Sequence, residues 1–307
     1  MAILLFSLLG CDDSVNPYAP FQPRMTVYAL LNTSSNVQII RVYSSFDPSV
    51  DPAGGSAPDT LLNDANITLS DQLNSYSLRD TILYRADTTQ YKGDIDAKVV
   101  SLVPVFGRTY TLTVQSPTKG TVTARATIPA QGTVSINGLF VLSDPLRYDA
   151  TSLGMNIKTN SRGYILRMLL EYEVYINGIW FPKQDEVPHN VQTGADSTLP
   201  PQYAQLELSK ENFSFLWPLN TLSYTLRMAI YRYNKYRITF KRVIIELRQY
   251  EEHLYDYYQV VRGFRDPRTI RTDTPDYTNL QGGLGIFGAF TVERTIFDLP
   301  PNYIKNQ

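Results

Sequence analysis

The stretch QGGLGIFGAF, Gln281 to Phe290, contains a literal G-x-G-x-x-G from Gly283 to Gly288. Such glycines indicate dinucleotide binding, and with it an α/β fold, only where a strand leads into them and a helix starts on them. Upstream, TIRTDTPDYTNLQ is turn chemistry without an apolar run, and downstream AFTVERTIF alternates like a strand. Neither context is present, so the segment is predicted to be a kinked strand that closes the second of two β-sheets.

The composition favours an all-β protein. Tyr (22) and Phe (13) suit half-buried pleated surfaces, and Pro (19) and Gly (17) supply turns. The 28 basic and 29 acidic residues leave a net charge of -1, so the basic excess that nucleic-acid binders use is missing. With 307 residues, 43% of them hydrophobic, the chain is large enough for two cores. We expect two domains and no nucleic-acid partner.

The N-terminus MAILLFSLLGC ends at Cys11, the single cysteine, so an internal disulfide or a cysteine-based metal site is excluded. The apolar run Ala2 to Leu9 and the Leu-Leu-Gly-Cys ending resemble a bacterial lipobox, in which the leader is cut before the cysteine and the thiol carries lipid. The run is too short to span a bilayer. We expect residues 1–11 to be a lipoprotein signal segment with lipid attachment at Cys11, although a Lys or Arg near Met1 is missing. A buried N-terminal strand is the alternative.

Residues 12–23 are predicted to be a Pro-rich tether. Asp12 and Asp13 are followed by Pro17, Pro20 and Pro23, and proline at this density favours an extended spacer. No later segment approaches 18 consecutive apolar residues, so membrane attachment is expected through lipid only.

Residues 24–130 are predicted to form a β-sandwich domain. Apolar and polar residues alternate with period two in several short runs, for example from Met25 to Leu31 and from Val122 to Ile128. Roughly seven such strands in this length fit an immunoglobulin-like or transthyretin-like sandwich. The segment IPAQGT, Ile128 to Thr133, is the expected boundary.

Residues 131–307 are predicted to form a larger antiparallel β domain. In GYILRMLLEYEVYINGIWF the even positions from Tyr164 to Ile176 are apolar, and charged residues occupy the other face. Asn177-Gly178 is typical of a two-residue turn with positive φ, so Ile179 to Phe181 should pair back as a hairpin. A second hairpin is predicted from the alternation between Leu222 and Ile230 and the turn around Asn234-Lys235.

The remaining pattern predicts a bulge and one helix. From Phe240 to Val243 the apolar phase slips by one residue, as a β-bulge produces. Apolar residues then recur with helical spacing from Leu247 to Val261, and Gly263 follows. We therefore expect a helix near 246–262 that packs across the second sheet.

Several segments together resemble a known family. They are TNLQGGLGIFGAFTVER, ELRQYEEHLYDYYQVVRGF, GRTYTLTV, ATIPA and the lipobox leader. In these the chain is similar to the Bacteroidota lipoproteins of domain-of-unknown-function family 4249. The resemblance implies a two-domain, mostly β, outer-membrane-anchored protein that is often found with TonB-dependent receptors. It implies no activity, and hence no catalytic residue.

The residues themselves offer little catalytic chemistry. His189 and His253 are the only histidines, and neither H-E-x-x-H nor G-x-S-x-G occurs. The pairs Asp94 with Asp96 and Asp273 with Asp276 have oxygen ligands for calcium, but they follow no EF-hand pattern and are interpreted as solvated loop residues. We expect no metal, no cofactor and no enzymatic activity.

The leading hypothesis is therefore a non-enzymatic, lipid-anchored protein of the outer membrane, on either its periplasmic or its surface face. It would be a binding or accessory subunit associated with a TonB-dependent receptor. Candidate contact residues are loop aromatics, with burial in the core as the alternative: Trp180, Phe181, Phe213, Phe215 and Trp217. The rival hypotheses are a structural subunit of a surface assembly, built by strand addition, and a carboxylate-dependent glycan hydrolase.

Overall fold

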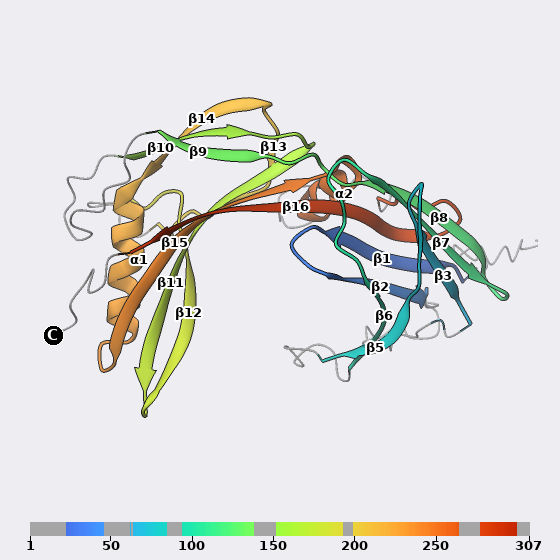
Figure 1. Cartoon of the computed structure of the whole chain (residues 1–307), viewed down its shortest axis with the longest axis horizontal. Coiled ribbons are helices and arrows are strands. Elements are labelled where there is room, and N and C mark those ends of the chain that lie inside the picture. The colour runs from blue at the N-terminus through green and yellow to red at the C-terminus, as the bar shows by residue number, and fades with distance from the viewer. Residues whose placement is uncertain are drawn as a thin grey trace, which may run out of the picture.

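The computed structural model of the protein describes residues 23–45, 62, 64–84, 94–137, 152–192, 199–263 and 277–299. In these ranges most residues lie in strands of three sheets, and two helices pack on them (Figure 1). The predicted all-β class is confirmed.

The largest sheet has nine strands and contains segments from both predicted domains. Its pairings are antiparallel except that of β1 with β16, which is parallel. A short strand, β13 (Glu207–Leu208), pairs with β11. The main path runs through β12 (Ile179–Val187), β11 (Gly163–Ile176), β15 (Arg237–Tyr250), β16 (Leu284–Asp298), β1 (Met25–Asn32), β2 (Val37–Ser44), β6 (Ile95–Ser101) and β5 (Arg79–Leu83).

One half of this sheet forms a sandwich with a four-stranded sheet. The smaller sheet runs in the order β4 (Ser75–Tyr76), β3 (Asn66–Ser70), β7 (Thr109–Ser116) and β8 (Gly120–Thr127). Alternate residues of both layers meet in one core, which includes Met25, Val27, Leu112 and Val122. Phe287, from β16, belongs to the same core, so the sandwich expected from residues 24–130 is completed by the C-terminal strand.

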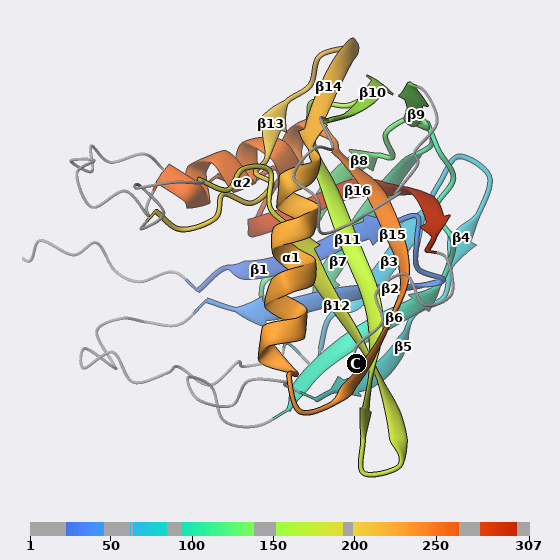
Figure 2. The ribbon, with the colours of Figure 1, turned by 90° about the vertical axis from the view of Figure 1, so that its left-hand side faces the viewer.

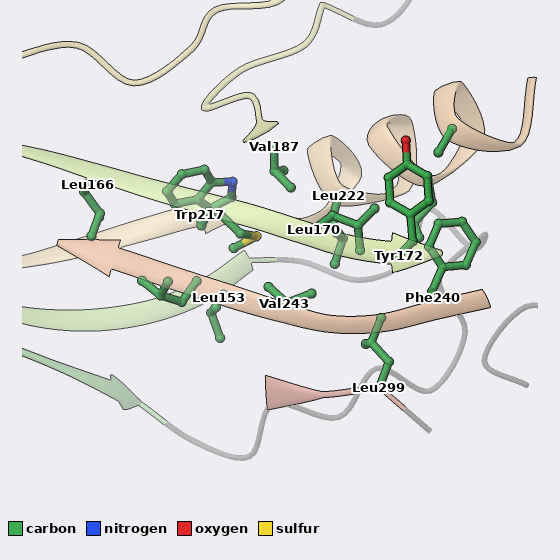
Figure 3. Packing of buried hydrophobic residues seen from close by; sticks show 14 of the residues in the cluster. Leu153, Leu166, Leu170, Tyr172, Val187, Trp217, Leu222, Phe240, Val243 and Leu299 are labelled. Atoms are coloured by element: carbon green, nitrogen blue, oxygen red, sulfur yellow. The ribbon is translucent and has the colours of Figure 1, made fainter. Parts of the chain in front are cut away.

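The other half of the large sheet packs against a helix and a three-stranded sheet. The helix is α1 (Leu219–Arg232), and the strands run in the order β14 (Asn212–Pro218), β10 (Ser152–Lys158) and β9 (Thr133–Asn137). Figure 3 shows Trp217, Leu166 and Leu170 in the core between these layers. Figure 2 shows α1 standing in front of β11 and β12. A second helix, α2 (Glu252–Gly263), packs Leu254 against Tyr250 and Ile286.

The glycine-rich stretch is the strand β16, as predicted. It does not close a second sheet, because it lies inside the large sheet, between β15 and β1. There its backbone comes closer to its neighbours than a side chain would permit. A Cβ on Gly285, whose φ is 107°, would lie 2.1 Å from the carbonyl oxygen of Val27. A Cβ on Gly288 would lie 2.9 Å from Cβ of Leu254. The glycines thus permit close packing of β1 and α2.

The predicted hairpin and bulge are both confirmed. Asn177 and Gly178 have φ values of 49° and 88°, and they join β11 to β12 with Ile176 opposite Ile179. The register between β11 and β15 shifts at Glu171, so that Lys241 is the extra residue of the bulge.

The second predicted hairpin is wrong, because its first strand is the helix α1. Pro218 precedes the helix with φ −68° and ψ 119°, and Leu222, Leu226 and Ala229 form the buried face. Apolar residues at Leu222, Leu226 and Ile230 fit both the alternation of a strand and the i, i+4 spacing of a helix. Apolar spacing alone therefore does not distinguish a strand from a helix here. The start of the helix expected near 246–262 is also wrong, because the residues up to Tyr250 extend β15.

A buried carboxylate interacts with arginines on three adjacent strands of the large sheet. Glu246, on β15, has a side chain that is 0% exposed. It accepts hydrogen bonds from Arg248 at 2.6 Å and from Arg294, on β16, at 2.8 Å, and Arg167, on β11, lies 3.4 Å away. Burial raises the pKa of Glu246, but hydrogen bonds and charge from Arg294 and Arg248 outweigh it, so the pKa is lowered.

We expect Gly285→Ala to lower the free energy of unfolding far more than Gly107→Ala. Both glycines have positive φ, but an added Cβ meets nothing within 4 Å at Gly107 and meets the Val27 carbonyl at Gly285. The control should cost about 1 kcal/mol, from backbone strain alone, and Gly285→Ala about 3 kcal/mol or more. Urea unfolding followed by circular dichroism measures both. Equal losses would show that close approach at β16 contributes nothing.

We expect Glu246→Gln to lower the free energy of unfolding at pH 7 by about 3 kcal/mol, because the three partly exposed arginines around this buried position lose their shared carboxylate. Since the pKa of Glu246 is lowered, its stabilisation is complete above the ordinary value of 4.5 and is lost as the pH falls through the folded-state pKa. The difference in unfolding free energy between the wild type and Glu246→Gln should therefore decrease at acidic pH. Glu171→Gln, at a partly exposed ion pair with Arg242, is the control and should cost less than about 1 kcal/mol.

Candidate functional site: a polar groove and an aromatic hairpin

A polar groove of about 740 Å³ lies where the four-stranded sheet meets the start of α2. Its residues come from β7, from β8 and the segment after it, from the 160–162 turn, and from 251–253. The polar side chains that line it are Thr109, Arg125, Thr127, Asn160, Ser161, Arg162, Glu251, Glu252 and His253. Both charge signs and several hydrogen-bonding groups are present, so the groove is suited to a polar ligand or segment.

The glycines between positions 282 and 288 permit close contact with β8 and α2, two elements that also carry groove residues. Gly282 and Gly283 allow the chain to lie against Thr121 and Val122 of β8, where a Cβ would approach to 2.4 Å and 2.6 Å. Gly288 does the same for the start of α2. The glycine-rich segment therefore sets the spacing between β8 and α2.

The Glu251 carboxylate has a structural role at the N-terminus of α2. Its two carboxylate oxygens accept hydrogen bonds from the amides of His253 and Leu254, each at 2.9 Å, and so cap α2. Burial raises the pKa of Glu251 and outweighs these amide hydrogen bonds. His253 is held by a 2.7 Å hydrogen bond between its Nδ1 and the hydroxyl of Tyr277. The exposed charges in the groove are those of Arg125, Arg162 and Glu252.

The turn that forms another wall is fixed by a buried glutamine. The Gln249 side chain accepts a hydrogen bond from the backbone amide of Asn160 at 2.7 Å and donates one to the carbonyl oxygen of Ala130 at 3.1 Å. Asn160 in turn donates to the Gln131 carbonyl at 2.9 Å. The 160–162 side of the groove is thus held by side-chain hydrogen bonds to the backbone.

Two of the predicted contact residues are exposed at the tip of the β11–β12 hairpin. Trp180 is 39% and Phe181 40% exposed, beside Ile179 at 60%. The Trp180 ring lies 5.0 Å from that of Tyr175, and the guanidinium of Arg237 lies about 6 Å from both rings. Figures 1 and 2 both show this hairpin projecting beyond the rest of the sheet.

The other three predicted contact residues belong to the core of the second half. Phe213 and Phe215 are half-buried against it. Trp217 is 0% exposed and donates to the hydroxyl of Thr221 at 3.1 Å, and the ring of His189 packs edge-on 4.4 Å from it. A surface-contact role for Trp217 is therefore wrong, because alternation along β14 turns it inward. Cys11 lies outside the described residues.

The structure also bears on the expectations for metal sites and membrane-spanning segments. In the described ranges, no group of three or more His, Cys, Asp or Glu side chains could hold a metal ion. Asp273 and Asp276 lie outside those ranges. None of the described helices is long and apolar enough to span a bilayer. Sequence reasoning missed the groove itself, although Ile128 to Ala130, part of the quoted ATIPA motif, line it.

The fold and the groove define an all-β protein in which a four-stranded sheet and a helix are held around a polar cleft by one glycine-rich strand. The model of a family described as Domain of unknown function (DUF4249) matches residues 13–296. The chain belongs to this family, as its motifs predicted. A comparison with curated proteins finds no match.

We expect Trp217→Ala to lower the free energy of unfolding by about 4 kcal/mol, because it removes a fully buried ring and leaves a cavity. Trp180→Ala, at the hairpin tip, should cost less than about 1 kcal/mol. Urea denaturation followed by circular dichroism suits both variants, since it does not depend on tryptophan emission. A larger loss for Trp180→Ala would contradict the separation of core and surface aromatics.

Proposed function

We propose that the protein is a non-enzymatic, lipid-anchored binding subunit of the outer membrane that works with a TonB-dependent receptor. The observation that carries the proposal is the polar groove, whose walls are positioned by the most distinctive segment of the sequence. In this proposal a polar segment of the receptor, or a ligand passed to it, occupies the groove.

The chemistry of the groove supports binding in preference to hydrolysis. Glycoside hydrolysis needs two carboxyl groups facing one bond. Both oxygens of Glu251 already accept hydrogen bonds from helix amides, and Glu252 is the other carboxylate in the groove lining. The exposed Arg125 and Arg162 instead provide positions for charge-assisted hydrogen bonds to a partner.

The proposed lipid anchor is supported by the N-terminal sequence. The Leu-Leu-Gly-Cys sequence at Cys11 supports lipid attachment, and the prolines that follow it support a spacer between the membrane and the folded body. The family resemblance supports the pairing with a receptor.

One edge of the large sheet supports this function over a structural subunit built by strand addition at that edge. β12 lies at one end of the strand path, and it carries Pro182 and Lys183; β5 lies at the other end. Proline withholds a backbone donor and lysine adds an exposed charge, two features that discourage pairing with a neighbouring chain.

A pull-down of the tagged, full-length protein from its native envelope in mild detergent tests the proposal. Mass spectrometry would identify the co-purified proteins and the state of the Cys11 peptide. We expect lipidated Cys11 and a TonB-dependent receptor. The double variant Arg125→Glu, Arg162→Glu should keep the lipid and lose at least about 90% of the receptor, because each reversed charge replaces an attractive contact with a repulsive one.

The matched control is Arg79→Glu, which reverses an exposed charge on β5, outside the groove. It should retain the receptor at the wild-type level. An unlipidated Cys11, or recovery of copies of the chain alone, would overturn the proposal, and the second result would favour a structural assembly.

A further inference from the structure

We propose that the tip of the β11–β12 hairpin, together with the turn between α1 and β15, docks onto an anionic lipid surface. We call this surface the aromatic tip and define it as residues 175–183 and 233–239. The inference goes beyond the proposed function, since it requires neither the groove nor a receptor.

The composition of the aromatic tip differs from that of the strands behind it. Its sequences are YINGIWFPK and YNKYRIT, which contain five aromatic residues, three cationic residues and no Asp or Glu. The register brings the two segments together, because Tyr175 pairs with Arg237. Apolar and aromatic side chains with a basic rim are the combination found where proteins enter the interfacial region of a bilayer.

The charges nearest the aromatic tip leave it positive. The acidic residues on the adjoining part of β11 are Glu171 and Glu173. Glu171 lies 3.1 Å from Arg242 and Glu173 lies 2.7 Å from Lys241, so both carboxylates are already neutralised by β15. Lys183, Lys235 and Arg237 are exposed. Each basic residue near an anionic surface adds attraction, and no acidic residue of the tip opposes it.

The shape of the aromatic tip favours lipid over protein as its occupant. The hairpin projects in both views of the molecule and ends in the two-residue turn at Asn177-Gly178 (Figures 1 and 2). A stable protein interface covers about 800 Å² on each partner, which favours a broad surface over a projecting hairpin end. Entry into a bilayer requires only that an apolar end pass the headgroups while the cations stay among them.

The contacts at the tip also arrange it for such entry. The Arg237 guanidinium lies over Tyr175 and Trp180, so its charge stays beside the rings at the base of the tip. Ile179 lies nearer the turn and is 60% exposed, whereas Phe181 lies opposite Val174, one position behind Trp180. The Ile179 side chain would enter the lipid first, while Arg237 and Lys235 meet phosphate groups.

Tryptophan emission tests the proposal, because the chain has two tryptophans and one of them, Trp217, is fully buried. The full-length protein carrying Cys11→Ser would be mixed with vesicles of phosphatidylethanolamine and phosphatidylglycerol, and separately with phosphatidylcholine vesicles. With the anionic vesicles we expect a blue shift of the emission and quenching by brominated lipid. In Trp180→Phe both signals should vanish while co-sedimentation remains, since Trp217 does not reach the lipid.

Three further variants distinguish specific docking of the tip from nonspecific adsorption to lipid. Ile179→Asp should lower the vesicle partition coefficient about tenfold or more. Ile82→Asp, at the same residue type on β5 with 57% exposure against 60% for Ile179, should leave it unchanged. Lys235→Glu with Arg237→Glu should remove the preference for anionic vesicles.

An emission spectrum that vesicles do not change would overturn the proposal. So would a vesicle response that Trp180→Phe leaves intact. If vesicles have no effect but Trp180 is shielded from iodide by a co-purified protein in the native envelope, the tip is a protein contact instead. These readouts are independent of the groove, so their failure is distinct from loss of the receptor in the pull-down.

Discussion

The close approach of the backbone at residues 282–288 to β8, β1 and α2 is the constraint on which the rest of the structure depends. β16 pairs with β15 and β1, contacts β8, and supports the start of α2. At Gly282, Gly283, Gly285 and Gly288 a methyl group would overlap an atom of one of these elements. The glycines cost conformational entropy, and the dense packing of both cores around one strand offsets it.

This arrangement explains how the structural and functional features relate. The same strand that completes the sandwich core through Phe287 also carries Arg294 to the buried carboxylate of Glu246. The groove uses the distance that β16 fixes between β8 and α2. The aromatic tip lies at the other half of the large sheet, on the hairpin of its edge strand, so the two candidate surfaces are spatially separate (Figure 1).

Local signals in the sequence predicted local structure well. Asn177-Gly178 specified its turn, the slipped phase after Phe240 specified its bulge, and the flanks of the G-x-G-x-x-G specified a strand. The sequence does not distinguish the α1 helix from a strand, because residues that recur every four positions also satisfy an alternation of two. Pairing between β1 and β16, and the groove that follows from it, arise from contacts between distant segments that no local pattern encodes. Trp217 and Trp180 both sit in short aromatic runs, and only the packing of α1 and β14 separates them.

The parallel pairing of β1 with β16 joins the first described strand to the last. Contacts between segments so distant in sequence are slow to form, because the closure of a long loop must precede them. The sandwich core lacks Phe287 and Ala289 until the C-terminal strand is present. A chain emerging N-terminus first therefore cannot complete its central sheet until nearly all of it has been delivered. The topology therefore delays completion of the central sheet until β16, which ends at Asp298, is available to pair with β1.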